Sequence, residues 1–486
     1  MFFHSSEELC KRFSELLVLK EKEKNFVLSF LRKFSRREDL FLVGGCVRAL
    51  FTGERIKDID IAVKEDIVKL ADFGSRYLRF TLVPLSHKFG IYRLAKGDFS
   101  IDFTLFRGET IEEDLFKRDF TINAIACPVR CLFEGSVRFV DPLGGIEDLK
   151  KGIIKAIAEE NIEEDPLRIL RGYRFFAQDL GKLEEKTREY FKKHAKRLIL
   201  CARERILYEL SLILLSEKSY ETFRMMEEDK VLEVIFPYLE ECKGVEQPSF
   251  HHLDVFGHLM ESLKWAEEIL KEPEKYLGIS LKEKREDKDF IMGVKLASFF
   301  HDLGKARTYK EDEKKGRITF YQHEKVSALL FEEMAEELRF KNELIEFVIN
   351  LIRNHMRPFH LLNEREKGKL TVRAKRNLIK DVKSLEGLFV VAMADSLASQ
   401  GPDKEPDYEE KLKEFFHELL RFKNEFEKEV RVKRIITGHD LIALGFKPGP
   451  IFKKILQDVE VKFLEKKIRS KEEALEYVKE KYGKRL

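Results

Sequence analysis

The sequence predicts an α+β protein in which a small mixed β-sheet near the N-terminus is followed by helices to the end of the chain. Residues 40–140 alternate short runs of Val, Ile, Phe and Tyr with Gly and Pro, which is typical of strands and turns. From Leu149 onward, Leu, Ile and Phe recur every three or four residues among Lys and Glu, which indicates amphipathic helices. Since 486 residues are too many for one hydrophobic core, several domains are expected.

Five segments follow from these patterns. We expect an N-terminal helical segment (1–38), a head that holds the sheet (39–148), a helical neck (149–225), a helical body (226–430) and a helical tail (431–486). Within the head, the expected strands lie in the runs FLVGG, DIDIAV, YRLAKG, SIDFTLF and RFVDPLGG.

The charge balance excludes a uniformly basic protein. Lys and Arg number 91 against 88 Asp and Glu, a net charge of +3, so any surface for nucleic acid must be local. Residues 431–486 hold 15 Lys and Arg against 8 Asp and Glu, a net charge of +7, which makes the tail a candidate polyanion contact.

Charged residues make up 37%, with Lys and Glu leading, a bias typical of thermophiles. The 43% of hydrophobic residues exclude a disordered chain.

The cysteines and the N-terminal residues predict a cytoplasmic protein without a membrane anchor. The six cysteines form no CxxC pair, so neither a disulfide framework nor a zinc knuckle is expected. Charged residues come too early for a secretory signal, and the apolar run 40–47 is far shorter than the roughly 18 residues that span a bilayer.

The sharpest chemical signal is the acidic run DIDIAV. Asp58 and Asp60 are two residues apart in a predicted strand, so both carboxylates point to the same face. Hard oxygen ligands side by side suit Mg²⁺ holding a nucleoside triphosphate. Asp102, in the run FSIDFTLFR, could add a third carboxylate from another strand, and two metals on three carboxylates suit in-line nucleotidyl transfer. A solvated strand face is the alternative for the Asp-x-Asp pattern alone.

Upstream of these carboxylates, a glycine pair ends the first strand. Gly44 and Gly45 would let the backbone approach phosphates closely, with Arg48 as the charge partner.

Two further motifs follow in the chain. In KRDFTINAIA, Asp119 and Asn123 are four residues apart and are expected to share a helix face, where Arg118 would join them in holding a ribose and triphosphate. In EEDPLRILRGYRF, Asp165 precedes Pro166 and is a natural helix N-cap. Capping does not explain the three-residue spacing of Arg168, Arg171 and Arg174.

A set of histidines and aspartates lies farther along the chain, in the predicted helical body. An adjacent His-Asp pair, together with a His and an Asp from other helices, can surround a divalent metal ion. The candidates are His258, His301, Asp302 and Asp395, with His323 and His355 for a second metal position.

These motifs resemble those of the class II tRNA nucleotidyltransferases, which build or repair the CCA end, and of the related bacterial poly(A) polymerases. The family pattern GGxVRDxLLG is present except at Ala49, where the family has Asp. The resemblance implies a nucleotidyltransferase head, a neck that recognises the base, and an HD-type body. It also implies Mg²⁺ as cofactor, tRNA lacking its 3′ end and CTP (or ATP) as substrates, and base selection by Asp165 and Arg168 with Arg171 in support.

The nucleotide added is suggested by a short segment. Family members that add the whole CCA carry a long flexible segment before the RDFTINA motif, whereas here only residues 108–117 separate Arg107 from Arg118. In the family, this deletion accompanies enzymes that add two cytidines and stop, so we expect CC addition and a separate A-adding enzyme in the same cell. Full CCA addition, A addition and poly(A) synthesis remain as alternatives.

A function of another class is phosphohydrolysis by the HD-type set, with the head only sensing nucleotide. A non-catalytic RNA-binding protein is disfavoured, because a scaffold without metal has no need to cluster like charges at Asp58, Asp60 and Asp102.

Overall fold

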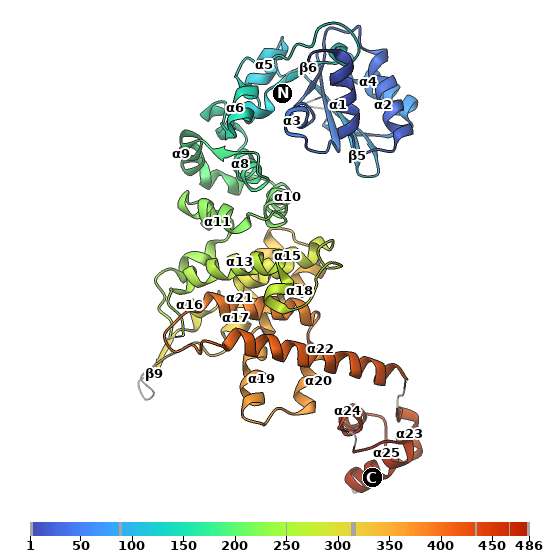
Figure 1. Ribbon diagram of the computed structural model, residues 1–486, viewed down its shortest axis with the longest axis vertical. Coiled ribbons are helices and arrows are strands. Elements are labelled where there is room, and N and C mark those ends of the chain that lie inside the picture. Colours follow the sequence, from blue (N-terminus) through green and yellow to red (C-terminus); the bar gives the residue numbers. More distant parts are fainter. Residues whose placement is uncertain are drawn as a thin grey trace. The chain divides into compact units, whose positions relative to one another are not determined.

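The computed structural model describes residues 3–86, 90–248, 250–312, 317–432, 435–465 and 467–483. It consists of two compact units, Met1–Ile235 and Phe236–Leu486 (Figure 1). The first unit contains a mixed sheet and helices and the second is almost entirely helical, which confirms the predicted α+β class.

The head of the first unit is built on a six-stranded sheet of order β3-β4-β5-β2-β1-β6. β2 and β5 are parallel, and the other neighbouring strands are antiparallel. The strands are β1 (Leu40–Val43), β2 (Asp58–Val63), β3 (Thr81–Ser86), β4 (Ile91–Lys96), β5 (Phe99–Leu105) and β6 (Ala126–Pro128). The helices of the head are α1 (Ser6–Leu16), α2 (Glu21–Lys33), α3 (Gly45–Thr52), α4 (Ile67–Leu78), α5 (Ile111–Phe116) and α6 (Gly145–Lys151).

Two edge strands were not predicted, and one predicted strand is nearly absent. β3 and β6 contain Pro84 and Pro128, and an edge strand tolerates proline because one of its sides needs no ladder hydrogen bonds. The run RFVDPLGG contributes only a single bridge, between Val140 and Ala126.

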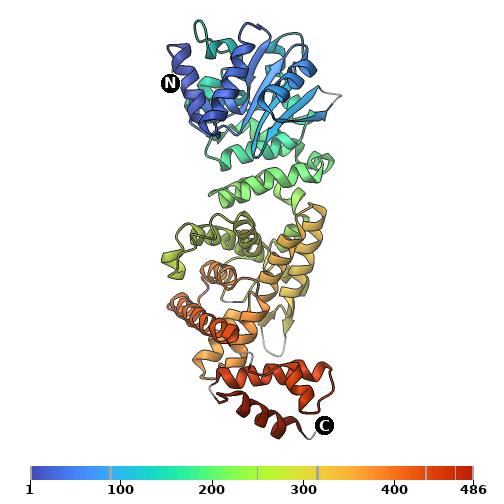
Figure 2. The ribbon, with the colours of Figure 1, turned by 90° about the vertical axis from the view of Figure 1, so that its right-hand side faces the viewer.

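The N-terminal segment 1–38 packs into the head. Leu9 and Phe13 of α1 and Val27 and Phe30 of α2 belong to the same buried cluster as the strands. Figure 2 shows these dark-blue helices alongside the sheet. The segment is helical, as its periodicity predicts, and it completes the core of the head.

The neck follows the head in the first unit. Its helices are α7 (Glu159–Glu164), α8 (Leu167–Ala177), α9 (Glu185–His194), α10 (Arg203–Leu214), α11 (Ser219–Glu228) and α12 (Leu232–Ile235), so the first unit continues ten residues past the expected end of the neck at 225. The expected all-α neck also contains a short parallel pair, β7 (Ile153–Ile154) with β8 (Lys182–Leu183). Two-residue strands have too little pattern to be recognised from sequence. Short 3₁₀ turns lie at Thr121–Asn123, Val129–Leu132, Ala195–Leu200 and, in the second unit, Pro237–Cys242.

The second unit is a helical body built around α21 (Leu385–Ala398), most of whose residues are buried, as expected of a helix that is apolar on all sides. α13 (Val255–Lys271) and α15 (Lys288–Phe300) pack against it. The other helices of the body are α14 (Pro273–Leu277), α16 (Lys305–Thr308), α17 (His323–Glu337), α18 (Asn342–Asn354), α19 (Arg357–Glu366), α20 (Val372–Asp381) and α22 (Tyr408–Val432). An antiparallel pair, β9 (Lys310–Asp312) with β10 (Arg317–Thr319), was not predicted.

The tail has a small core of its own. α23 (Gly438–Ala443), α24 (Pro450–Leu464) and α25 (Lys471–Tyr482) bury Leu441, Ile455 and Val478 together. Over the described residues of the whole chain, no helix combines the length and the apolar character that crossing a membrane requires.

Candidate functional site

The three predicted carboxylates come together on β2 and β5. Asp58 and Asp60 lie two residues apart on β2, and the intervening Ile59 is fully buried on the opposite face. Asp102 of β5 is the direct register partner of Asp60. Because β2 and β5 are parallel neighbours, the chain brings residues 42 positions apart into one acidic cluster.

The electrostatics of this cluster are those of a site that needs a cation. Burial, together with the charges of Asp102 and Asp58, raises the pKa of Asp60 to about 6, although Arg118 and Arg171 oppose the shift. A buried carboxylate whose pKa is raised in the protein alone gains most from a bound divalent cation. The donor set of hard oxygens fits Mg²⁺.

Two partners orient the carboxylates. The Ser100 hydroxyl donates a 2.6 Å hydrogen bond to Asp58 Oδ1. Arg93, across the strand pair on β4, donates from Nε and Nη2 to the two oxygens of Asp102 at 2.8 and 2.7 Å. Sequence reasoning missed Arg93, because only the β4–β5 register reveals the pairing.

Gly44 connects the end of β1 to α3 in a conformation that requires glycine. Its φ is +66°, and a Cβ at this position would lie 3.1 Å from Asp60 Oδ2. Gly45 then begins α3, so the first backbone N–H groups of this helix lie beside the acidic cluster. This arrangement suits a phosphate bridged by a metal ion to the carboxylates.

A chain of charged side chains leads from α3 to the neck. Arg48 forms an ion pair with Glu54 (3.0 Å) and donates to Asn123 Oδ1. Asn123 Nδ2 donates to Asp119 at 3.1 Å, and Arg171 Nε donates to the other oxygen of Asp119 at 2.9 Å. Asp119 and Asn123 therefore meet as expected, but Asn123 ends a 3₁₀ turn and Asp119 precedes that turn, so the two do not share one face of an α-helix.

This network lowers the pKa of Asp119. Burial alone would raise it, but Arg171, Asn123 and the backbone N–H of Phe120 more than offset that effect. Asp119 is thus a fixed negative charge that holds Arg171, whose guanidinium also acts electrostatically on Asp60.

Glu209 of α10 closes the network on the neck side. It accepts from Arg174 Nε at 2.6 Å and lies 3.6 Å from Arg171 Nη1. The guanidiniums of Arg48, Arg171 and Arg174 all lie over the ring of Phe175. Sequence spacing alone would have paired Glu209 with Arg205, one helical turn earlier, so the role of Glu209 could not be read from the local pattern.

The short segment before Arg118 is an ordered helix. Thr110 caps α5, and the buried Asp114 accepts from Arg118 Nη2 at 2.8 Å and from the backbone N–H of Arg107 at 3.1 Å. Arg118, an expected triphosphate ligand, is thereby held next to Gly44: a Cβ on Gly44 would be 3.6 Å from Arg118 Nη1.

The structure does not join Asp165 to Arg168, the pair expected to read the base. Arg168 is buried and donates to three backbone carbonyls, those of Lys117, Arg118 and Asn161, at 3.0–3.2 Å. Asp165 instead accepts from Arg205 Nη2 at 2.8 Å. Since Arg205 lies 40 residues from Asp165 on another helix, local spacing could not indicate this partner.

In the second unit, the predicted His-Asp set converges. The Nε2 atoms of His258 and His301 lie 3.3 Å apart, and each lies 3.2–3.7 Å from a carboxylate oxygen of Asp302 and of Asp395. The other oxygen of Asp302 faces His323 (3.1 Å) and His355 (3.5 Å). Asp302 therefore lies between two groups of ligand atoms.

This geometry fits divalent metal ions. Neighbouring ligands about 2.1 Å from one ion are about 3 Å apart when they meet it at right angles. The Nδ1 atoms of His301, His323 and His355 lie 2.7–2.9 Å from backbone carbonyls, an arrangement in which an Nδ1 proton leaves each Nε2 as an acceptor for a metal. Burial lowers the pKa of His301, but Asp302 and Asp395 outweigh it and raise the pKa to about 10, so these carboxylates favour positive charge beside them, which a bound metal ion would supply in place of the proton.

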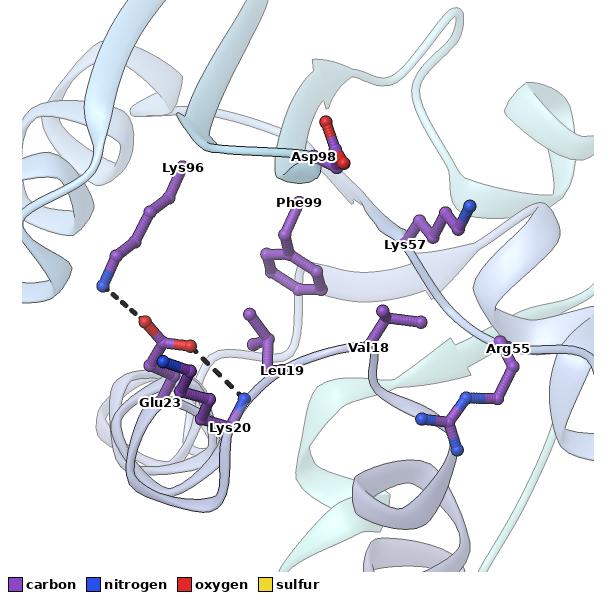
Figure 3. Close-up of a pocket in the computed structure, with 9 residues that line it drawn as sticks. All are labelled: Val18, Leu19, Lys20, Glu23, Arg55, Lys57, Lys96, Asp98 and Phe99. Carbon is purple, nitrogen blue, oxygen red and sulfur yellow. Dashed lines mark hydrogen bonds and ion pairs between the residues drawn. The ribbon is translucent and has the colours of Figure 1, made fainter. Parts of the chain in front are cut away.

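A separate cavity of about 490 Å³ opens on the head (Figure 3). Four cationic side chains line it, and one of its anionic groups, Glu23, forms an ion pair with Lys96 at 2.8 Å. Two of its lining residues, Lys57 and Phe99, lie close in sequence to the acidic cluster. None of the candidate site residues lines the cavity.

Three family models match the chain. They are the Poly A polymerase head domain (residues 40–155), the Probable RNA and SrmB-binding site of polymerase A (182–243) and the HD domain (255–399).

Curated relatives match over most of the chain. A CC-adding tRNA nucleotidyltransferase from Thermus thermophilus is 31% identical, covering 91% of this chain and 93% of the relative. An A-adding tRNA nucleotidyltransferase from Deinococcus radiodurans is also 31% identical, covering 86% of this chain and 89% of the relative. Among solved structures, the Thermotoga maritima CCA-adding enzyme complexed with tRNA matches with a TM-score of 0.62 at 23% identity, covering 97% of both chains.

Proposed function

Because this chain belongs to the class II tRNA nucleotidyltransferase family, we propose that it adds two cytidines to the 3′ end of tRNA without a template and releases pyrophosphate. The observation that carries this proposal is the acidic cluster Asp58, Asp60 and Asp102 beside the glycine turn at Gly44. Carboxylates gathered beside a glycine turn, where the backbone can approach a phosphate closely, suit metal-dependent nucleotidyl transfer.

The residues of the head have distinct roles in this proposal. Asp58, Asp60 and Asp102 would hold Mg²⁺, which when bound activates the terminal 3′-hydroxyl and stabilises the departing pyrophosphate. The N–H groups at Gly45 and the guanidinium of Arg118 would bind the triphosphate.

The charged network then positions the sugar and the phosphates. Asp119 and Asn123 would hold the ribose, while Arg48 and Arg171, fixed by Glu54 and by Asp119, would supply positive charge. Arg168 holds the backbone at residues 117–118 in place. Asp165 would accept a hydrogen bond from the exocyclic amine that cytosine and adenine share.

The ordered segment 108–117 supports CC addition. The relatives named CC-adding and A-adding are equally identical to this chain, so overall identity does not separate the two activities. The segment is only ten residues long and most of it is the capped helix α5, tied down through Asp114. It has no room for the long flexible segment of enzymes that add the whole CCA, and the final A would then come from a separate enzyme.

Nucleotide addition to three tRNA substrates tests this proposal. The tRNAs end before the first C, after one C and after two Cs, and each is offered CTP or ATP with Mg²⁺. We expect CTP to extend the first two and ATP to leave the third unchanged. Addition of A to the third tRNA would contradict CC specificity, and addition of A alone would identify an A-adding enzyme.

The charge distribution of the tail supports the proposal that the tail contacts the tRNA backbone. Its acidic residues Asp440, Asp458 and Glu465 are neutralised by neighbouring lysines. Within the described part of the tail, the exposed Lys447 and Lys453 have no ion-pair partner, so their charge is available to phosphates.

A second candidate function, phosphoester hydrolysis in the second unit, is favoured by the convergence of five further ligand residues around Asp302. We propose that this site binds a divalent transition metal. The purified chain, incubated with Mn²⁺ and then desalted, is expected to retain the metal, because buried carboxylates and oriented imidazoles form the site.

Asp395→Asn is expected to reduce the Mn²⁺ retained at least about tenfold, measured by elemental analysis. Asp381→Asn, which alters an exposed carboxylate paired with Arg357, is the matched control and should retain the metal. Equal retention by both variants would contradict the assignment. Loss of phosphatase activity in Asp395→Asn, with nucleotide addition intact, would show that the two chemistries are separate.

A further inference from the structure

Arg93 on β4 lies one strand beyond the acidic cluster, toward the β3 edge of the sheet. We propose that Arg93 binds the last phosphodiester of the tRNA 3′ end while it holds Asp102, so that it places the RNA end that receives the nucleotide. This inference rests on the proposed nucleotide addition, and it assigns a residue to the RNA side of the same site.

The residues that carry the inference lie in a single row across the sheet. From β1 to β3 the row is Val43, Asp60, Asp102, Arg93 and Val83, each the register partner of the next. The glycine turn directly follows the first of these residues, so the row begins at the expected triphosphate site. Because neighbouring strands lie about 4.8 Å apart, Arg93 is roughly 14 Å from that end of the row.

The geometry of the reaction places the RNA at the Arg93 end of this row. In an in-line displacement, the attacking 3′-hydroxyl and the departing pyrophosphate lie on opposite sides of the reacting phosphorus. The pyrophosphate side would be at Gly44, beside β1, so the 3′-hydroxyl would approach from the side of β5 and β4. The last phosphodiester is one ribose away from that hydroxyl, and Arg93 is one strand away from Asp102.

The Arg93 guanidinium has donors left for a phosphate. Nε and Nη2 each donate one hydrogen bond to Asp102, at 2.8 and 2.7 Å, out of the five N–H groups of a guanidinium. Among the residues that the structure describes, no second acceptor engages these groups, which leaves three of the five for a ligand. The side chain of Arg93 is 39% exposed and the neighbouring Val83 is 37% exposed, so RNA can reach this part of the face.

The hold on Asp102 is compatible with a bound metal ion. Each carboxylate oxygen has two lone-pair directions, of which Arg93 takes one, so the other is available to Mg²⁺. A guanidinium that binds both oxygens also fixes the plane of the carboxylate. One rigid group would thus orient Asp102 toward the metal and the RNA end toward attack.

The charge of Arg93 offsets the repulsion between the RNA and the acidic cluster. Three carboxylates repel an approaching phosphodiester. β3, β4 and β5 are described throughout, and on the face that carries the carboxylates Arg93 is their one cationic side chain. Lys96, also on β4, lies toward the other face, where it pairs with Glu23 of α2 at 2.8 Å. Arg93 is therefore the residue of these strands that can attract the RNA end.

Steady-state kinetics of the full chain, with tRNA that ends before its first C, test the proposal. In Arg93→Gln we expect the KM for tRNA to rise at least about tenfold and the KM for CTP to stay within about twofold, because the lost contact is with RNA. The plot of log kcat/KM for tRNA against log salt concentration should become shallower by about 0.7, the contribution of one phosphate contact in a single strand.

Arg93→Lys separates the contact with RNA from the hold on Asp102. Lysine keeps the positive charge but lacks the planar fork. We expect the KM for tRNA to return close to that of the wild type, while kcat is reduced in both variants because Asp102 is no longer held at both oxygens. Arg76→Gln is the matched control, since Arg76 pairs with Asp72 on α4, which packs on the opposite face of the sheet, and its loss should change neither KM.

An uncharged RNA analogue tests the same contact in the unaltered chain. With a tRNA whose last phosphodiester is a methylphosphonate, the wild type should show a similar rise in the KM for tRNA. Arg93→Gln should lose little more with this analogue, because the two changes remove the same contact. A methylphosphonate in the anticodon loop, far from the 3′ end, is the control and should leave the KM unchanged.

Two results would overturn the inference. The first is an unchanged KM for tRNA, either in an active Arg93→Gln or in the wild type with the uncharged analogue. The second is an equal rise in the KM values for tRNA and CTP in Arg93→Gln, which a merely structural role would produce. If the wild-type chain adds no nucleotide to any of the tRNAs, the proposed function itself fails.

Discussion

Replacing Asp60 by Asn is expected to reduce cytidine addition to tRNA by about a thousandfold or more, since the variant loses a negative charge at the centre of the candidate metal site. Asp60 faces Asp102 across the parallel strand pair and shares its strand face with Asp58. The measurement is the rate of labelled CTP incorporation at saturating tRNA and Mg²⁺.

The same substitution is expected to stabilise the protein in the absence of metal. The pKa of Asp60 is about 6 in the folded protein, above its ordinary 3.8, so ionisation of this carboxyl costs stability as the pH rises through this window. At pH 7, Asp60→Asn should gain roughly 1–3 kcal/mol over the wild type, and the difference should vanish below about pH 4.

With Mg²⁺ bound, the wild type should become the more stable of the two proteins. Mg²⁺ is expected to raise the melting temperature of the wild type and to leave that of Asp60→Asn nearly unchanged. A variant that retains activity, or that Mg²⁺ stabilises as much as the wild type, would contradict the assignment of Asp60. Asp98→Asn, an exposed carboxylate at the β4–β5 turn, is the control and should behave as the wild type does.

Glu209→Ala is expected to destabilise the first unit by about 3–5 kcal/mol, because it leaves the guanidinium of Arg174 without its buried acidic partner and that of Arg171 with Asp119 alone. The Glu209 side chain is 2% exposed, so water cannot replace the lost carboxylate. Calorimetry should show the melting transition of this unit about 10 °C lower. The KM for CTP should rise as well, because Arg171 loses one of the two acids that position it.

The exposed pair Glu163–Arg197 provides the control. Glu163→Ala removes an ion pair of 3.1 Å on the neck surface and should change stability by less than about 1 kcal/mol. A melting transition in Glu209→Ala as high as that in Glu163→Ala would show that the arginine network contributes no stability.

The elements that could be predicted from the sequence are those whose signal is local. The two-residue spacing of Asp58 and Asp60 is enough to predict a shared strand face, and the period of three to four residues is enough to predict the helical remainder. The adjacent His301 and Asp302 likewise indicated the cluster that the structure brings together in the second unit.

The rest depends on contacts between residues distant in sequence. Arg93 is recognised as the partner of Asp102 only once β4 and β5 are in register, and Arg205 as the partner of Asp165 only once α10 packs against α8. The four-residue spacing of Arg205 and Glu209 would suggest a pair on one helix, but their tertiary partners outcompete such a pair, which is worth only about 0.2–0.5 kcal/mol. The two edge strands β3 and β6 could not be predicted because each contains a proline, which argues against a strand in the sequence pattern.

Extension of a tRNA transcript that ends before its first C tests the central claim most directly. The purified chain is incubated with this transcript, CTP and Mg²⁺, and the length of the product and the pyrophosphate released are measured together. The account predicts a product two nucleotides longer, with one pyrophosphate for each cytidine added. A transcript of unchanged length, with no pyrophosphate released, would contradict it.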